Sequence, residues 1–319
     1  MGSIRAQLSV DALAQWGDRI RAQVTGVDLV AFDPDRGAIP GGPPEVAWLS
    51  VDVLRTPDVA FLDALLAADT LRWVQSAGAG YDTWHYQQLF AKGVRMSIAH
   101  VNNVPIAEYV MREVLDRFQR ADRWRTAATE HRWAHHEWRE IAGSTWLIVG
   151  LGAIGSAVAE RAKAFGTTVL GVRRSPDGTE PVDELHPPDA LAALLPRADV
   201  VVLSLPATPQ TNGLVDDAFL AAMKPDAVLV NVARGAIVDE DALLRALDAG
   251  RPDFAVLDVV GTEPLPADSP LWRHEKVVVT PHSSSGGHGR FARGADLFAD
   301  NVRRYVAGDP LLHEVHPGT

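Results

Sequence analysis

Short apolar runs alternate with segments of helical periodicity over most of this chain. Runs rich in Val, Leu, Ile and Ala lack the polar alternation of a half-exposed sheet, so they predict buried strands of a parallel sheet. These strands are expected at 146–149, 167–172, 199–206, 227–232, 254–260 and 276–281. Helices are expected between them at 156–165, 216–223 and 240–249, which is the rhythm of βαβ units. The pattern predicts a doubly wound α/β domain.

The preceding hundred residues also alternate between apolar runs and turns. Strands are expected at 27–30, 46–53 and 71–75, a helix at 59–68, and a loop at the Pro/Gly cluster 39–44. A long helix is expected at 104–125 and a final helix at 291–306. The strands before residue 100 are therefore expected to belong to a separate α/β region.

The composition agrees with two soluble domains in 319 residues, 47% of them hydrophobic. The net charge of −11 and the scattered basic residues argue against a nucleic-acid partner. The absence of cysteine excludes disulfides and thiolate chemistry. No apolar run approaches the ~18 residues of a membrane span, and the first residues show no signal-peptide pattern. We expect a cytoplasmic protein with no membrane partner.

The segment 150–155 reads Gly-Leu-Gly-Ala-Ile-Gly, directly after a predicted strand and before a predicted helix. In a dinucleotide-binding turn the first glycine permits the tight turn, the second admits the pyrophosphate, and the third lets helix and strand pack closely. The helix N-terminus, here Ala153 and Ile154, offers N–H groups to the phosphates. Gly150, Gly152 and Gly155 are thus predicted cofactor contacts, and a purely structural glycine turn is the alternative.

Arg173, Arg174 and Ser175 follow the second strand, where an NAD enzyme carries an acidic residue for the ribose 2′-hydroxyl. Two guanidinium groups and a hydroxyl suit the 2′-phosphate of NADPH, which a carboxylate would repel. The sequence therefore favours NADPH/NADP over NADH/NAD, and a solvated basic turn is the alternative.

Two further segments have competing interpretations. The turn 76–82 follows a predicted strand, and the amides of Ala79 and Gly80 are suited to hold a substrate carboxylate, although an ordinary strand-to-helix turn accounts for them nearly as well. His131 and His135 have the spacing of a metal-binding pair on a helix, but a third ligand is missing from the pattern. A solvated helix or an interface is favoured there, and no metal is expected.

Arg234, Glu263 and His282 each follow a predicted strand, and parallel strands place such loops at one edge of the sheet. Arg234 suits a substrate carboxylate, and His282 suits proton transfer to a carbonyl oxygen. Glu263 is placed to orient the imidazole and favour its protonated form, and Asp258 to face a nicotinamide amide. Taken singly, each of these residues is equally compatible with an ordinary loop.

The chain resembles the D-isomer-specific 2-hydroxyacid dehydrogenases. The matching segments, in the order of that family, are AGAGYD (77–82), GLGAIG (150–155), SLPATPQTNGLV (204–215), MKPDAVLVNVARGAIVDEDALLRALDAG (223–250), LDVVGTEPLP (257–266) and TPHSSSG (280–286). The resemblance assigns the catalytic arginine, glutamate and histidine to Arg234, Glu263 and His282, and the carboxylate-binding turn to Ala79 and Gly80. It also implies cofactor contacts at Pro206, Thr211, Val232, Ala233, Asp258 and Ser284.

The resemblance implies a Rossmann-type, doubly wound parallel sheet inserted into a flavodoxin-like α/β substrate domain. The substrate-binding domain would comprise 1–101 and 287–319, and the dinucleotide-binding domain 102–286. The family implies a homodimer built on the nucleotide domains. Arg173 in place of the NAD-type acidic residue is typical of its NADPH-preferring glyoxylate/hydroxypyruvate reductase branch, and Ser204 in place of a common histidine is compatible with that branch.

The expected activity is NADPH-dependent reduction of glyoxylate, hydroxypyruvate or a related 2-oxo acid to the D-2-hydroxy acid. A reductase of bulkier acids such as phenylpyruvate is an alternative, because tryptophans such as Trp48 are available to line a larger pocket. Glu263 argues against a formate dehydrogenase, and phosphoglycerate dehydrogenase ranks lower because no appended regulatory domain is seen. An alternative of another class is a non-catalytic dinucleotide sensor or corepressor.

Overall fold

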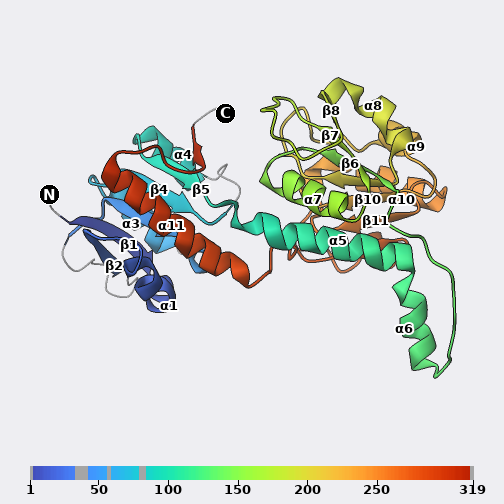
Figure 1. Cartoon of the computed structure of the whole chain (residues 1–319), viewed down its shortest axis with the longest axis horizontal. Helices are drawn as coiled ribbons and strands as arrows, with labels where there is room; N and C mark the ends of the chain where they lie inside the picture. The colour runs from blue at the N-terminus through green and yellow to red at the C-terminus, as the bar shows by residue number, and fades with distance from the viewer. Residues whose placement is uncertain (1–2, 33–41, 56–58, 79–83, 317–319) are drawn as a thin grey trace. The chain divides into compact units, whose positions relative to one another are not determined.

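The computed structural model describes residues 3–32, 42–55, 59–78 and 84–316. The chain divides into two compact units, 1–102 with 288–319, and 103–287 (Figure 1). Each boundary lies one residue after the position expected from the sequence. Within the described ranges, no helix combines the length and the apolar character that crossing a membrane requires.

Unit 1 (1–102 with 288–319) is built on a sheet in the order β13-β5-β4-β3-β1-β2. All neighbours are parallel except the short β13, which runs antiparallel to β5. This is the flavodoxin-like order with one added edge strand. The strands are β1 (Ile4–Ser9), β2 (Val27–Phe32), β3 (Val46–Leu49), β4 (Trp73–Ser76), β5 (Arg95–Ile98) and β13 (Glu314–Val315).

Two apolar clusters cover the faces of this sheet. One packs α1 (Val10–Arg21) and α11 (Gly289–Ala307) against Trp48 and Trp73, with Phe298 stacked on both rings at 5.6 Å. The other contains residues from the opposite side of the sheet and its helices. The helices in this second layer are α2 (Val51–Arg55), α3 (Val59–Ala67) and α4 (Trp84–Ala91).

Unit 2 (103–287) is built on a parallel sheet in the order β12-β11-β10-β9-β6-β7-β8. The order reverses between β6 and β9, which is the switch point where open α/β sheets bind ligands. The strands are β6 (Thr145–Val149), β7 (Thr168–Val172), β8 (Glu184–His186), β9 (Val200–Leu203), β10 (Val228–Asn231), β11 (Phe254–Leu257) and β12 (Val277–Val279). They are almost wholly buried from β6 to β11, as the unbroken apolar runs predicted.

Helices cover both faces of this second sheet. On one face α5 (Asn103–Gln119) packs beside α7 (Ala153–Ala164), and on the other lie α8 (Leu191–Leu194), α9 (Asp217–Ala222) and α10 (Glu240–Asp248) (Figure 1). The doubly wound parallel sheet beside a flavodoxin-like unit confirms the predicted fold class.

Several predicted boundaries are wrong, each for a local reason. The expected strand 46–53 ends at Leu49, and α2 follows, because short apolar runs fit strand and helix equally. The expected helix 104–125 breaks at Arg120, whose φ of +51° is left-handed, and continues as α6 (Ala121–Thr129). His131 and His135 lie beyond the end of α6, so their spacing does not place them on one helical face.

The strands expected at 199–206 and 254–260 end at Leu203 and Leu257. Their predicted extensions are loops, and Val259 and Val260 in the second loop are buried although they belong to no strand. Apolar loop residues of this kind imitate a strand in the sequence. The sequence also missed β1, α1 and the edge strand β8.

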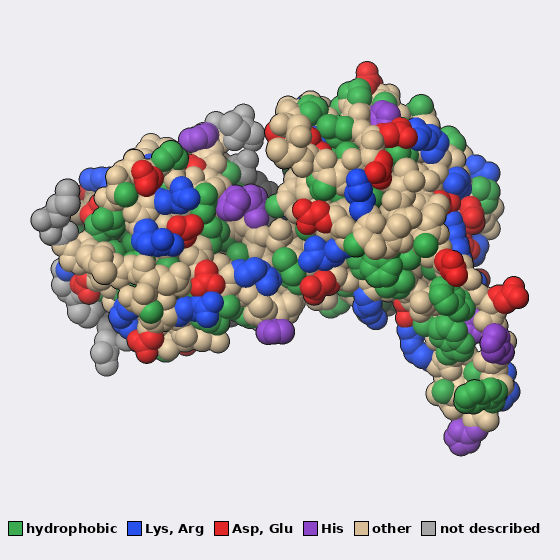
Figure 2. Space-filling model, in the orientation of Figure 1, with side chains coloured by type: hydrophobic (Ala, Val, Ile, Leu, Met, Phe, Trp, Pro, Cys, Tyr) green, Lys and Arg blue, Asp and Glu red, His purple; other side chains and the backbone are tan. Residues whose placement is uncertain are grey.

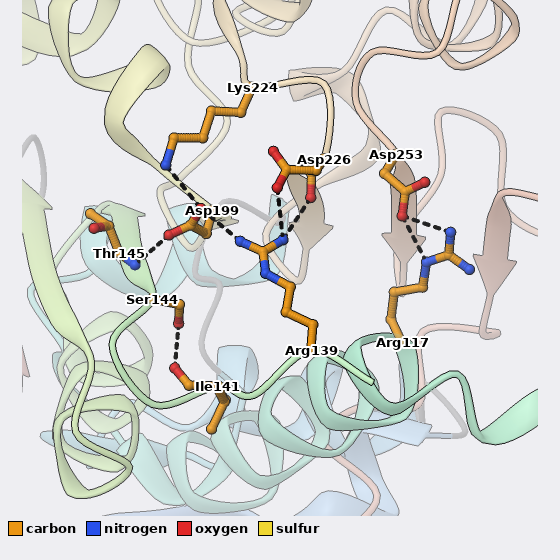
Figure 3. A network of polar contacts seen from close by, with 9 residues as sticks. All are labelled: Arg117, Arg139, Ile141, Ser144, Thr145, Asp199, Lys224, Asp226 and Asp253. Atoms are coloured by element: carbon orange, nitrogen blue, oxygen red, sulfur yellow. Dashed lines mark hydrogen bonds and ion pairs between the residues drawn. The ribbon is translucent and has the colours of Figure 1, made fainter. Parts of the chain in front are cut away.

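The helix α6 and the extended segment 130–140 form an arm that projects from the rest of unit 2 (Figure 1). The chain returns from this arm to β6 through a network of polar contacts (Figure 3). Arg139 donates to Asp199 at 2.7 Å and lies over the ring of Phe118 at 4.3 Å. Asp199 also accepts from the Thr145 N–H at 2.7 Å and from Lys224 at 2.9 Å.

Asp199 is the centre of this network, with a side chain only 13% exposed. Burial by itself would raise the pKa of Asp199, but the Thr145 N–H, Lys224 and Arg139 together lower it. The ionised carboxylate therefore anchors the base of the arm to the start of the β6 and β10 strands.

We expect Asp199→Asn to lower the free energy of unfolding at pH 7 by about 1.5–3 kcal/mol, because hydrogen bonds to a charged acceptor are lost. A folded-state pKa below the ordinary value of about 3.9 stabilises the fold above that pH, and the contribution disappears as pH falls further. Urea unfolding at pH 7 and near pH 3 measures both effects. Asp226→Asn is the control, because its side chain is 68% exposed. Equal losses in the two variants would contradict the assignment.

Candidate active site

The glycine turn between β6 and α7 has three different local environments. At Gly150, φ is +97° and a Cβ would lie 2.8 Å from the Leu205 nitrogen. At Gly155, a Cβ would lie 2.0 Å from the Gly150 oxygen. At Gly152, φ is −82° and a Cβ would meet nothing within 4 Å. The outer glycines are thus required by packing, whereas the middle glycine borders open space.

The open space beside Gly152 lies at the N-terminus of α7, where no side chain caps the helix. Its first N–H groups, including those of Ala153 and Ile154, have no partner within the helix itself and favour an anion. A phosphate group fits this combination of bare N–H groups and open space. The turn is therefore compatible with the pyrophosphate of a dinucleotide.

The loop after β7 carries Arg173, Arg174 and Ser175. The guanidinium of Arg173 contacts Glu180 and Asp177, each at 2.9 Å. Arg174 and Ser175 are exposed, and neither makes a side-chain hydrogen bond or ion pair with the described residues. Two cationic side chains and a hydroxyl thus lie just beyond the strand next to the glycine turn, as the sequence predicted.

Loops after β9 and β10 continue this edge of the sheet. Thr211 donates its hydroxyl to the Pro206 carbonyl at 2.7 Å and so closes the first loop. After β10, Val232 and Ala233 are buried, and the side chain of Asn231 accepts from the Ala233 N–H and donates to the Arg234 carbonyl, both at 3.0 Å. Asn231, which sequence reasoning missed, therefore shapes the backbone at Arg234.

Arg234 itself is exposed, and its guanidinium contacts only the neighbouring Ala233 carbonyl, at 2.7 Å, within the described residues. The next residue, Gly235, packs against the loop after β11, where a Cβ would lie 2.0 Å from the Val260 carbonyl group. This close approach holds the loop of Arg234 against the loop that leads to Glu263. The guanidinium is left available for an anionic group.

His282 and Glu263 form a direct pair. The imidazole Nδ1 lies 2.8 Å from Glu263 Oε2, and Glu263 Oε1 accepts from the Val260 N–H at 3.2 Å. An ionised Glu263 requires the proton on Nδ1, so the other nitrogen, Nε2, faces away from the carboxylate. Both side chains are partly exposed, at 51% and 39%. The pair presents an oriented imidazole that can exchange a proton at Nε2.

Asp258 builds the loop that carries His282. Its carboxylate is 1% exposed and accepts from the Thr280 hydroxyl at 2.7 Å, the Ser283 N–H at 2.9 Å, and both the N–H and the hydroxyl of Ser284. Its carbonyl accepts the His282 N–H at 2.8 Å. The structure thus gives Asp258 and Ser284 a role in shaping the loop, while their predicted contacts with a cofactor stay predictions.

A second hydroxyl extends this arrangement to helix α5. Tyr109 and Thr280 lie 2.8 Å apart, and because Thr280 gives its proton to Asp258, Tyr109 must be the donor. Burial, first among several influences, raises the pKa of Tyr109, so the phenol keeps its proton. Tyr109 was not identified from the sequence, because a tyrosine in a predicted helix shows no such partner.

The remaining predictions are placed as follows. Ala79 and Gly80, the predicted carboxylate-binding turn, lie outside the described residues. Trp48 lies in unit 1, where it is 2% exposed and lines a cavity of about 560 Å³ with Ser50 and Asp52. None of the predicted catalytic or cofactor-binding residues lines that cavity. In the described part of the chain, no three His, Asp or Glu side chains gather as a metal site would require.

Comparison with known proteins agrees with this geometry. Residues 111–284 match the sequence model described as "D-isomer specific 2-hydroxyacid dehydrogenase, NAD binding domain". The chain is 33% identical to a glyoxylate/hydroxypyruvate reductase A of Escherichia fergusonii, over 79% of this chain and 82% of that protein. It is also 35% identical to a D-3-phosphoglycerate dehydrogenase of Mycobacterium bovis, over 99% of this chain. The chain spans only 58% of the length of that mycobacterial relative.

Solved structures share the whole fold. A D-isomer specific 2-hydroxyacid dehydrogenase from Xanthobacter autotrophicus, in complex with NADPH and MES, superimposes with a TM-score of 0.80. The two sequences are 31% identical, and the alignment covers 99% of each chain. The arrangement of two α/β units described above is therefore also found in this relative.

We expect Gly155→Ala to lower the free energy of unfolding by about 3 kcal/mol or more, because the new methyl group collides with backbone. Gly152→Ala should change it by less than about 1 kcal/mol, because φ is ordinary and the space is open. Thermal unfolding with and without a nicotinamide dinucleotide measures both variants. A methyl group at 152 should abolish the stabilisation that a dinucleotide gives the unaltered chain, about 2.7 kcal/mol at 100 times Kd. Retained stabilisation would show that phosphates do not bind beside Gly152.

Proposed function

This chain belongs to the D-isomer specific 2-hydroxyacid dehydrogenase family, and from that premise we propose that it reduces glyoxylate, hydroxypyruvate or a related 2-oxo acid to the D-2-hydroxy acid, with NADPH as the reductant. The observation that carries this proposal is the contact of 2.8 Å between His282 Nδ1 and Glu263. It leaves an oriented imidazole nitrogen for proton transfer at the edge of the sheet where the glycine turn also lies.

Each residue has a distinct task in this reaction. The bound dihydronicotinamide supplies the hydride to the carbonyl carbon. Nε2 of His282 gives its proton to the carbonyl oxygen, and Glu263 holds the ring and stabilises the positive charge on the imidazole before that transfer. Arg234 binds the substrate carboxylate through its unoccupied guanidinium nitrogens and keeps the carbonyl in reach.

The residues present fit a dinucleotide. Gly150, Gly152 and Gly155 with the N-terminus of α7 would hold the pyrophosphate. Arg174 and Ser175, which are exposed and without side-chain partners in the described residues, would bind the 2′-phosphate together with Arg173. The relative from Xanthobacter autotrophicus was solved with NADPH, which supports this cofactor for the present chain. Pro206, Thr211, Val232 and Ala233 would line the rest of the cofactor path.

A second candidate is oxidation of a phosphorylated 2-hydroxy acid. The identity of 35% to D-3-phosphoglycerate dehydrogenases, over nearly the whole of this chain, favours it. It uses the same His282, Glu263 and Arg234 and differs only in the substrate side chain. A reductase of bulkier acids and a non-catalytic dinucleotide sensor are outcomes of the same assay.

The arm of unit 2 (α6 with 130–140) suggests how two copies associate. Its exposed aromatic side chains are Trp124 (37%), Trp133 (102%) and Trp138 (45%), and of α6 itself only Ala127 is buried (Figure 2). An arm with so much exposed apolar surface needs a covering partner. The family's usual homodimer supplies one, so a second copy of this chain is the proposed occupant.

The assay follows loss of NADPH or NADH with glyoxylate, hydroxypyruvate, 3-phosphohydroxypyruvate, pyruvate and phenylpyruvate. We expect NADPH and one of the two smallest hydroxylated or aldehyde acids to give the highest kcat/KM. His282→Ala should lower kcat by roughly 10²- to 10⁴-fold with little change in NADPH binding, because only proton transfer is lost.

His274→Ala is the matched control, because this histidine pairs with Asp248 and lies outside the site loops. Unchanged turnover in His282→Ala would remove this residue from the mechanism. Highest activity with 3-phosphohydroxypyruvate would select the second candidate. NADPH binding without turnover of any acid would select the sensor.

For the arm, we expect Trp133→Glu to shift sedimentation of the chain from a dimer to a monomer, because a charge would be placed in the proposed interface. The fold should survive, since the side chain of Trp133 is fully exposed within one copy. Val306→Glu, which alters an exposed apolar residue at the end of α11, is the control and should leave the dimer intact. A Trp133→Glu variant that remains dimeric contradicts this interface.

A further inference from the structure

The loop 173–180 after β7 brings two carboxylates to one guanidinium nitrogen. Nη1 of Arg173 lies 2.9 Å from Glu180 Oε1 and 2.9 Å from Asp177 Oδ2. The backbone N–H of Arg173 is fixed separately by the His186 carbonyl of β8, at 3.1 Å. The side chain that is proposed to read the 2′-phosphate is therefore already engaged by anionic groups from its own loop.

Glu180 is an integral part of this loop. Its side chain is 2% exposed, and it accepts from the Asp177 N–H at 2.8 Å and the Gly178 N–H at 2.9 Å in addition to Arg173. The hydrogen bond from the Asp177 backbone, first among several influences, lowers the pKa of Glu180. Displacing this carboxylate would leave two backbone donors without acceptors, so Glu180 keeps its place and anchors Arg173.

Asp177 is held differently. Its side chain is 50% exposed, and only Oδ2 contacts Arg173. Oδ1 is occupied by the Thr179 N–H at 3.0 Å and the Thr179 hydroxyl at 2.5 Å. Moving Oδ2 away from Arg173 therefore costs one exposed ion pair, which contributes roughly 0.2–1 kcal/mol. Of the two carboxylates, Asp177 is the one that an incoming anion can replace.

An anionic oxygen on an arginine nitrogen is also what a 2′-phosphate presents. Resting on the proposed use of NADPH, we infer that Asp177 is a specificity-determining residue: its carboxylate occupies the Arg173 contact that a 2′-phosphate needs. NADPH must displace and then remain close to this like charge, whereas NADH, with an uncharged 2′-hydroxyl, does not. The charges of Asp177 and Glu180 balance those of Arg173 and Arg174, which moderates the preference for NADPH.

Fluorescence titration of the full chain with NADPH and with NADH tests this inference. Asp177→Asn removes the charge but keeps an Oδ1 acceptor for Thr179. We expect the Kd of NADPH to fall by about 2- to 10-fold, because one like charge close to a doubly charged phosphate is removed. The Kd of NADH should change by less than about twofold, because no charge lies on its 2′-hydroxyl.

Two further variants serve as controls. Asp177→Glu retains the charge and should keep the NADPH-to-NADH ratio of the unaltered chain. Asp248→Asn changes the net charge equally at the end of α10, where the side chain is 79% exposed, and should leave both affinities unchanged.

The outcomes separate this inference from the proposed function. Weaker binding of both cofactors to Asp177→Asn, or an unchanged ratio, overturns the role of Asp177. Tighter NADH than NADPH binding in the unaltered chain overturns the proposed cofactor preference, whereas a shift of the ratio towards NADPH in Asp177→Asn still supports the inference. A chain that binds neither cofactor overturns both.

Discussion

A buried carboxylate at the end of β11 is the constraint on which the candidate active site depends. Asp258 is 1% exposed, and an unpaired charge in such a position would be very unfavourable. Donors from the segment 280–284 satisfy it, so that this segment must wrap around the carboxylate. His282 lies in the middle of the wrap with a left-handed φ of +49°, held by the Asp258 carbonyl. The orientation of the imidazole is therefore set by the fold before any ligand binds.

Close backbone contacts then join neighbouring loops into one surface. Gly155 packs against Gly150, and Gly235 packs against Val260, at separations that leave no room for a side chain. The first contact sets the entry to α7, and the second connects the loops of Arg234 and Glu263. Because β10, β11 and β12 are parallel neighbours, their three loops emerge at the same edge of the sheet. Rigid elements thus support each polar side chain of the site.

The cofactor loop follows a different principle, because its charges are balanced. Arg173 is paired within its own loop, whereas Arg174 is exposed and without such a partner among the described residues. A cation that already has an anionic partner gains less from a second one than a free cation does. The count of arginines near the ribose site is therefore an incomplete guide to cofactor preference, and the carboxylates that face them have to be counted as well.

The sequence by itself determined the periodic α/β pattern, the glycine turn and the candidate residues Arg234, Glu263 and His282, because each depends on local spacing or on a recognisable motif. It did not determine the break at Arg120, where a left-handed residue interrupts an unbroken helical pattern. Nor did it reveal that Asp258 is enclosed by its neighbouring loop, that Tyr109 donates to Thr280, or that Asp177 and Glu180 share Arg173. These contacts join separate strands, helices and turns, and their geometry arises only when the chain is packed. Local sequence patterns specify the elements and the chemistry available, whereas tertiary packing decides which side chain meets which.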